Sequence, residues 1–250
     1  MKMLAANRGT ILGFSRRLRS KVRRDGIGGL ALAVWWQSWR RVNGSKRQER
    51  LLDGEFDRAH GVDTAGVISL YSLNLPNQEN LDHGLKYQGI NPNIFRKMMG
   101  ALPAIDFSKF VFIDYGSGKG RALLLAAEYP FSRIIGVEFA PELHMIAKRN
   151  IQAYRNSRQV CRAIQSICAD ATTYELPADP AVIYIYNPFD AVLMTRVLEN
   201  VAVSLAAHPR QLYLLVSGES LQTVVAGAGF RRLVQVSPGQ FGTAIFANSP

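Results

Sequence analysis

The chain has 250 residues, 48% of them hydrophobic, with 30 Lys and Arg against 19 Asp and Glu, and a formal net charge of +11. This apolar content excludes a disordered chain, and the presence of only Cys161 and Cys168 excludes a disulfide scaffold. No uncharged apolar run reaches the roughly 18 residues that a spanning helix needs, which excludes a polytopic membrane protein.

The positive charge is concentrated in residues 1–50. This arm carries thirteen Lys and Arg and two acids, whereas the other 200 residues carry 17 of each sign. Four apolar residues in the arm are spaced for one face of a helix, with arginines around them (Ile11, Phe14, Leu18 and Val22). An uncharged run with all three tryptophans follows at residues 26–39 and would measure about 21 Å as a helix, too short to span a bilayer. The arm is interpreted as an interfacial helix on an anionic surface or as a helix packed on the domain; both remain open.

Residues 51–109 are expected to form a helical and irregular cap on the substrate side. Residues 44–66 are polar and contain glycine, and residues 67–90 look irregular. A helix is predicted to begin at Asn91-Pro92, with Asn91 as its cap, and to run to about Ala101.

From residue 110 to residue 250, predicted strands and helices alternate. Strands are expected at 110–114, 133–138, 164–169, 181–186, 211–217, 232–236 and 243–247, with helices at 119–128, 141–154 and 191–207 and a short one ending near 229. This alternation predicts an α/β fold with a doubly wound, mostly parallel, seven-stranded sheet. The last two strands flank Pro238-Gly239 and are expected to add an antiparallel edge.

The most informative segment is Asp114-Tyr115-Gly116-Ser117-Gly118-Lys119-Gly120, between the first predicted strand and helix of this sheet. Glycines at this position allow a tight turn and close approach of a ligand. A dinucleotide site would need G-x-G-x-x-G, but Arg121 occupies the place of the third glycine. Asp114 would repel a pyrophosphate and suits a ligand with an amino group. The segment resembles motif I of class I S-adenosylmethionine (SAM)-dependent methyltransferases, written acid-x-G-x-G-x-G.

Three further features occur in the order that this family shows. Glu138 ends the second strand, where a carboxylate can accept both ribose hydroxyls. Asp170 and Ala171 follow the third strand, where the family binds adenine through the acid and the next backbone N–H. The resemblance covers roughly residues 110–250. It implies a Rossmann-like domain that binds SAM through Asp114, Gly116, Ser117, Gly118, Glu138, Asp170 and Ala171, without a metal.

The fourth strand ends at Asn187-Pro188-Phe189, where the family keeps its reaction centre. This tripeptide resembles the (Asp/Asn)-Pro-Pro-(Phe/Tyr) motif of amino methyltransferases. The resemblance implies that Asn187 and a proline carbonyl accept hydrogens from a substrate nitrogen, with the Phe189 ring packed against it. One proline stands where the motif has two, and a plain turn remains an alternative. Tyr87 is a candidate for closing over the methionine end of SAM.

Phe56–Gly66 reads F-D-x-x-x-G-V-D-T-x-G, an opening shared with a group of uncharacterised bacterial methyltransferases, and the stretch around motif I also resembles class I protein-lysine methyltransferases. A protein or small-molecule acceptor is favoured. The alternatives are a nucleic-acid methyltransferase that uses the basic arm and a SAM-binding protein without turnover. The expected location is cytoplasmic, with possible peripheral attachment to an anionic membrane.

The remaining polar residues are given structural roles. Lys119 and Arg121 are predicted to be solvated helix residues. The two cysteines have no Cys or His cluster around them, so no metal site is expected. The four histidines are scattered, and none is placed like a member of a catalytic triad (His60, His83, His144 and His208).

Overall fold

The structure is a computed structural model that describes residues 45–73, 83–237 and 242–248. The expectations for the basic, tryptophan-containing arm fall on residues 1–44 almost entirely, outside the described residues. The predicted Pro238-Gly239 turn also lies outside them.

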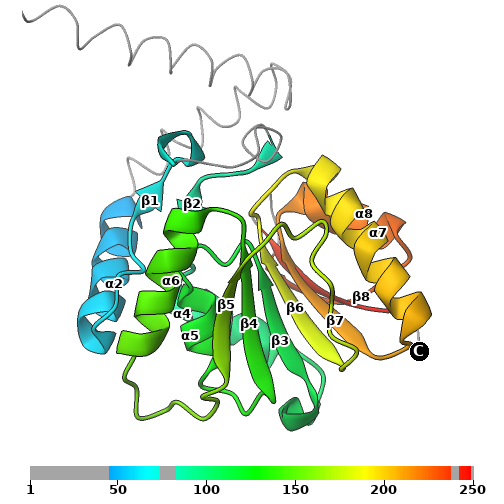
Figure 1. Cartoon of the computed structure of the whole chain (residues 1–250), viewed down its shortest axis with the longest axis horizontal. Coiled ribbons are helices and arrows are strands. Elements are labelled where there is room, and N and C mark those ends of the chain that lie inside the picture. Colours follow the sequence, from blue (N-terminus) through cyan, green and yellow to red (C-terminus); the bar gives the residue numbers. More distant parts are fainter. Residues whose placement is uncertain (1–44, 74–82, 238–241, 249–250) are drawn as a thin grey trace, which may run out of the picture. The chain divides into compact units, whose positions relative to one another are not determined.

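A seven-stranded sheet in the order β5-β4-β3-β6-β7-β9-β8 forms the centre of the domain (Figure 1). Neighbouring strands from β5 to β7 are parallel, and the strand order reverses between β3 and β6. The prediction of a doubly wound, mostly parallel sheet is therefore confirmed. The strands are β3 (Val111–Tyr115), β4 (Arg133–Glu138), β5 (Ile164–Cys168), β6 (Ala181–Tyr186), β7 (Leu212–Ser217), β8 (Arg231–Ser237) and β9 (Thr243–Ala247).

The last two strands add an antiparallel edge to the sheet, as predicted. β9 pairs antiparallel with both β7 and β8, so β9 lies inside the sheet and β8 forms the edge. Every residue of β9 is buried, whereas β8 begins with the exposed Arg231 and Arg232. The uncharged strand takes the position with two neighbours, and the charged strand takes the edge, where arginine side chains protect against further pairing.

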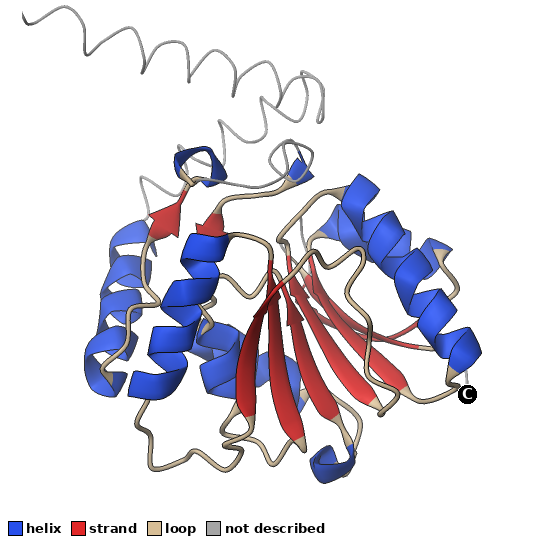
Figure 2. Ribbon diagram, viewed as in Figure 1, coloured by secondary structure: helices blue, strands red, loops and turns tan. Residues whose placement is uncertain are grey.

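Helices cover both faces of the sheet (Figure 2). One face packs against α4 (Pro92–Gly100), α5 (Arg121–Ala126) and α6 (Pro141–Ala153), and the other against α7 (Ala191–Ala207) and α8 (Glu219–Gly227). Successive residues of β3 serve opposite faces: Phe112 joins the cluster with Phe95 of α4, and Ile113 joins the cluster with Val197 of α7. This alternation explains why the central strands are apolar without interruption.

The segment before the sheet is more regular than predicted. Asn91 caps α4 as expected, with its side chain accepting a hydrogen bond from the Asn93 N–H at 2.9 Å. The short strands β1 (Val67–Ile68) and β2 (Tyr87–Gln88) pair antiparallel, and single turns of 3₁₀ helix occur at Leu70–Ser72 and Phe107–Lys109.

One helix was missed. α2 (Ser45–His60) covers a stretch for which the sequence analysis predicted no helix. Its inward face includes the polar Asp53 and Asp57 beside the apolar Phe56, so it lacks a long apolar stripe. No helix within the described ranges combines the length and the apolar character of a membrane span.

Candidate active site

The glycine turn after β3 is held in a conformation that residues with a side chain rarely adopt. Gly116 and Gly118 have φ angles of 75° and 55°. A Cβ on Gly116 would lie 2.3 Å from the Cβ of Pro188, and a Cβ on Gly118 would lie 2.2 Å from the Tyr87 ring. Both glycines are therefore required by backbone conformation and by close approach. The turn brings together four residues that the sequence analysis singled out from three distant segments.

Glu138 ties the end of β4 to this turn. Its Oε2 accepts a hydrogen bond from the Gly118 N–H at 2.7 Å, and its Oε1 accepts one from the Ala140 N–H at 2.9 Å. Each carboxylate oxygen retains a lone pair that a ligand hydroxyl can use. Glu138 therefore both shapes the turn and offers acceptors beside it.

Asp114 lies one strand away from Glu138, and both carboxyl groups are buried. Burial raises the pKa of Glu138 to about 7, against the opposing effect of its bonds to backbone N–H groups. Burial, and then the nearby Glu138, raise the pKa of Asp114 well above its ordinary value. Neither carboxylate has an ion-pair partner in the described part of the chain, so a cationic ligand would stabilise their ionised forms.

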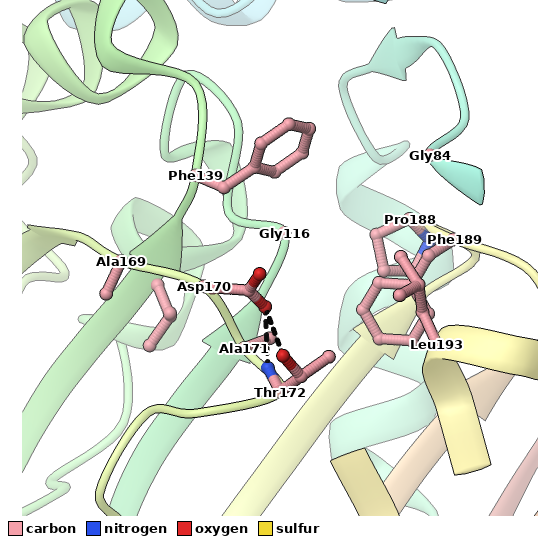
Figure 3. Close-up of a pocket in the computed structure, with 11 residues that line it drawn as sticks. Gly84, Gly116, Phe139, Ala169, Asp170, Ala171, Thr172, Pro188, Phe189 and Leu193 are labelled. Atoms are coloured by element: carbon pink, nitrogen blue, oxygen red, sulfur yellow. Dashed lines mark hydrogen bonds between the residues drawn. The ribbon is translucent and has the colours of Figure 1, made fainter. Parts of the chain in front are cut away.

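A small cavity of about 30 Å³ lies over the ends of β3, β4 and β6 (Figure 3). In Figure 3, Phe139 and Asp170 lie on one side of it, and Pro188, Phe189 and Leu193 lie on the other. Space of this size holds one or two waters and no nucleoside. The lining residues are Gly84, Gly116, Val137, Phe139, Ala169, Asp170, Ala171, Thr172, Pro188, Phe189 and Leu193.

The predicted site residues divide into two groups around this cavity. Gly116, Asp170, Ala171, Pro188 and Phe189 line it. The others stand next to these residues without lining it (Tyr87, Asp114, Ser117, Gly118, Glu138 and Asn187).

Asp170 and Ser117 illustrate the two groups. Asp170 Oδ1 accepts hydrogen bonds from the backbone N–H and the hydroxyl of Thr172, at 2.8 and 2.7 Å, which fixes the carboxylate at the cavity wall (Figure 3). The hydroxyl of Ser117 is buried against Gly136 and makes no hydrogen bond within the described chain. Ser117 therefore contributes its backbone to the turn, and its side chain faces the neighbouring strand.

Asn187 has an unusual backbone conformation at the end of β6. Its φ of 51° is the only positive value among the described residues other than glycine. Asparagine tolerates this region better than most residues, and such strain gathers at functional sites. Its Oδ1 lies 2.9 Å from the point that a Cβ on Gly218 would occupy, and its side chain makes no hydrogen bond within the described ranges. An unpaired amide therefore stands at the end of β6, beside Gly218 and directly before Pro188, which packs on Gly116.

The Pro188 carbonyl accepts a hydrogen bond from the Leu85 N–H at 2.9 Å, which holds residues 83–85 against the end of β6. The oxygen keeps a second lone pair. Phe189 is buried as part of the apolar cluster beneath α7 while its side chain lines the cavity. Among these three residues, Asn187 is the one whose polar group remains unengaged.

Lys119 and Arg121 are buried, and the prediction that they are solvated is wrong. Arg121 is 1% exposed, donates from Nε to the Thr64 hydroxyl at 2.7 Å, and pairs with Asp53 and Asp57. Lys119 pairs with Asp63 at 2.7 Å. The acids that neutralise these cations lie more than fifty residues earlier, where no spacing rule connects them to α5.

These contacts explain the F-D-x-x-x-G-V-D-T-x-G segment. Asp57 accepts hydrogen bonds from the N–H and hydroxyl of Thr64, at 2.8 and 2.5 Å, and from the Ala65 N–H at 2.6 Å. The Tyr87 hydroxyl donates to the Thr64 carbonyl at 2.5 Å, and its ring covers Gly118. The segment therefore links Arg121 to the position of Tyr87 over the glycine turn. Burial raises the pKa of Tyr87, so its hydroxyl stays protonated as a donor.

No group of three or more His, Cys, Asp or Glu residues in the described segments is arranged to hold a metal ion. Cys161 is buried and Cys168 is exposed.

Comparison with known proteins identifies a family for the central part of the chain. Residues 113–213 match the family model described as a methyltransferase domain. No curated protein sequence matches the chain.

Several solved structures have a similar fold. A TehB-like SAM-dependent methyltransferase from Corynebacterium glutamicum is 14% identical, with a TM-score of 0.42, and the match covers 62% of this chain and 87% of that one. The glycopeptide N-methyltransferase MtfA in complex with SAM is 10% identical, with a TM-score of 0.49 and coverage of 66% and 96%. The SAM-bound magnesium protoporphyrin IX methyltransferase from Synechocystis is 13% identical, with a TM-score of 0.41 and coverage of 63% and 77%. These likenesses are loose, and the assignment of the domain rests on the family model.

Proposed function

We propose that this chain, a class I SAM-dependent methyltransferase, transfers the methyl group to a nitrogen atom of its acceptor. The observation that carries the proposal is the unpaired Asn187 amide at the end of β6, held at φ 51° directly before Pro188, which packs on Gly116. The cofactor is SAM, which supplies a methyl group on a positively charged sulfur.

The residues around the turn suit SAM in their charge. Gly116 and Gly118 let Pro188 and the Tyr87 ring pack directly against the turn, where a Cβ would collide with them. The buried carboxyls of Asp114 and Glu138 suit a cation, and Glu138 would hold the ribose hydroxyls with its free lone pairs. Asp170 and Ala171 would hold the adenine edge, with Phe139 beside them as an apolar wall.

Asn187 supports a nitrogen acceptor for a chemical reason. Its carbonyl oxygen can accept an N–H of the acceptor and thereby direct the nitrogen lone pair, which is the nucleophile in methyl transfer. The Pro188 carbonyl accepts from the Leu85 N–H and keeps a second lone pair that could accept from the same nitrogen. Phe189 and Leu193 keep the surroundings apolar, which favours a neutral and reactive amine.

Replacing Asn187 with Ala should lower turnover about tenfold to hundredfold, since one orienting hydrogen bond is lost at the reacting centre. SAM affinity should stay within twofold of wild type. Turnover is measured as transfer of label from [methyl-³H]SAM into the protein, RNA, lipid and small-molecule fractions of a host lysate, and affinity by calorimetry. Asn187→Asp, which retains an acceptor oxygen, should recover part of the rate, and Val203→Ala on the exposed face of α7 is the matched control.

Two results would contradict this proposal. Label that is released as methanol by mild base would indicate a methyl ester and an oxygen acceptor. SAM binding without label in any fraction would indicate a binding protein without turnover.

A further inference from the structure

The segment before β2 pairs with the end of β6 beside the cavity. Gly84 forms an antiparallel bridge with Phe189, and the Asp190 N–H donates to the His83 carbonyl at 3.0 Å. Gly84, Phe189 and Leu193 lie on the same side of the cavity in Figure 3. His83 and Asp190 are therefore the immediate chain neighbours of residues that line the site.

The two side chains also meet. His83 Nδ1 lies 2.7 Å from Asp190 Oδ2, with the imidazole 30% and the carboxylate 16% exposed. The other carboxylate oxygen caps α7 by accepting hydrogen bonds from the N–H groups of Val192 and Leu193, at 2.9 and 3.3 Å. Capping of α7 accounts for the hydrogen bonds of Oδ1. It does not account for the contact between Oδ2 and His83.

This arrangement gives His83 the properties of a base. A carboxylate on Nδ1 keeps the proton on that nitrogen and leaves the lone pair on Nε2. The capped carboxylate is fixed, so it also fixes the orientation of the ring. The sequence analysis placed none of the histidines in such a group, because 107 residues separate His83 from Asp190.

We propose that His83 is the general base that takes a proton from the methyl acceptor, and that Asp190 is its positioning residue. The inference rests on the proposed methyl transfer. When an acceptor N–H is replaced by N–CH₃, the C–S bond breaks, the N–C bond forms, and one proton must leave. His83 Nε2 accepts that proton, the Asp190 carboxylate stabilises the resulting imidazolium, and the exposed part of the ring passes the proton to water.

His83→Gln should lower the rate of label transfer from [methyl-³H]SAM about a hundredfold, because general bases contribute at least this much. SAM affinity by calorimetry should change less than twofold. The loss of rate should remain at saturating SAM, where the cofactor site is full. The acceptor is the lysate fraction that the wild-type enzyme labels.

Asp190→Asn keeps an oxygen to cap α7 and removes the carboxylate from His83. The rate of label transfer should fall with SAM affinity unchanged, because the ring loses the partner that fixes its tautomer and orientation. His208→Gln, at the opposite end of α7, should change neither the rate nor the affinity.

Nitrogen-15 NMR of the imidazole gives a readout that needs no acceptor. In the wild-type protein with SAM bound, His83 should carry its proton on Nδ1, and Asp190→Asn should shift the ring towards the other tautomer. A proton on Nε2 in the wild type, or a rate in His83→Gln close to that of the wild type at saturating SAM, would overturn the role of His83. Absence of label with every variant and the wild type, together with the Nδ1–H tautomer, would instead count against the proposed transferase function.

Discussion

Replacing Arg121 with Ala is expected to lower the free energy of unfolding by about 4 kcal/mol, since breaking a buried ion pair commonly costs 3–5 kcal/mol. The guanidinium is 1% exposed and contacts Asp53, Asp57 and the hydroxyl of Thr64. Without it, two largely buried carboxylates face each other with no cation between them. Urea unfolding followed by circular dichroism measures the change.

Two variants sharpen this test. Arg121→Lys should recover only part of the stability, because an ammonium cannot reproduce the forked donor that reaches several partners at once. Arg133→Ala removes a surface ion pair with Asp179, whose partners are 44% and 50% exposed, and should cost less than about 1 kcal/mol. A loss in Arg121→Ala no larger than that of Arg133→Ala would show that the network adds little to stability.

Replacing Glu138 with Ala should weaken SAM binding about a thousandfold, equivalent to about 4 kcal/mol of lost hydrogen bonding to a charged group and of turn anchoring. The carboxylate would hold the ribose hydroxyls, and it also fixes the Gly118 N–H at 2.7 Å. Calorimetry with SAM measures the affinity. Glu175→Ala, outside the cavity lining, is the control, and an unchanged affinity in Glu138→Ala would contradict the assignment of this residue.

The raised pKa of Glu138 adds a pH dependence to both stability and binding. The titratable groups that face it are Asp114 on β3 and Cys168 on β5. Because the folded-state pKa of about 7 lies above the ordinary 4.5, the folded protein holds more protons between these values, and stability falls as pH rises through this window. Its contribution is on the order of 3 kcal/mol. SAM affinity should change in the opposite direction, rising towards pH 7 as the carboxylate ionises.

Glu138→Gln should flatten both trends, since the amide does not titrate. Urea unfolding and SAM calorimetry at pH 5 and pH 8, in the variant and the wild type, measure them. If the change in the free energy of unfolding between pH 5 and pH 8 is the same in the wild type and in Glu138→Gln, Glu138 titrates at an ordinary pKa.

The sheet and its glycine turn follow from local sequence. Residues 133–138, 181–186, 191–207 and 243–247 form the predicted elements with the predicted bounds, because buried strands and an apolar helix carry their own patterns. Asp114, Glu138 and Asn187 were found because parallel strands end at one edge of a sheet, so position after a strand is enough to gather them.

The partners of Arg121 and His83 could not be predicted from the sequence, because they lie in segments that are far apart in the chain. Spacing alone made Arg121 a solvated helix residue and His83 an isolated histidine, whereas folding pairs them with Asp57 and Asp190, 64 and 107 residues away. A local pattern reports which face of an element is buried, but a buried charge is stable only with a specific partner, and only the tertiary structure brings that partner into contact.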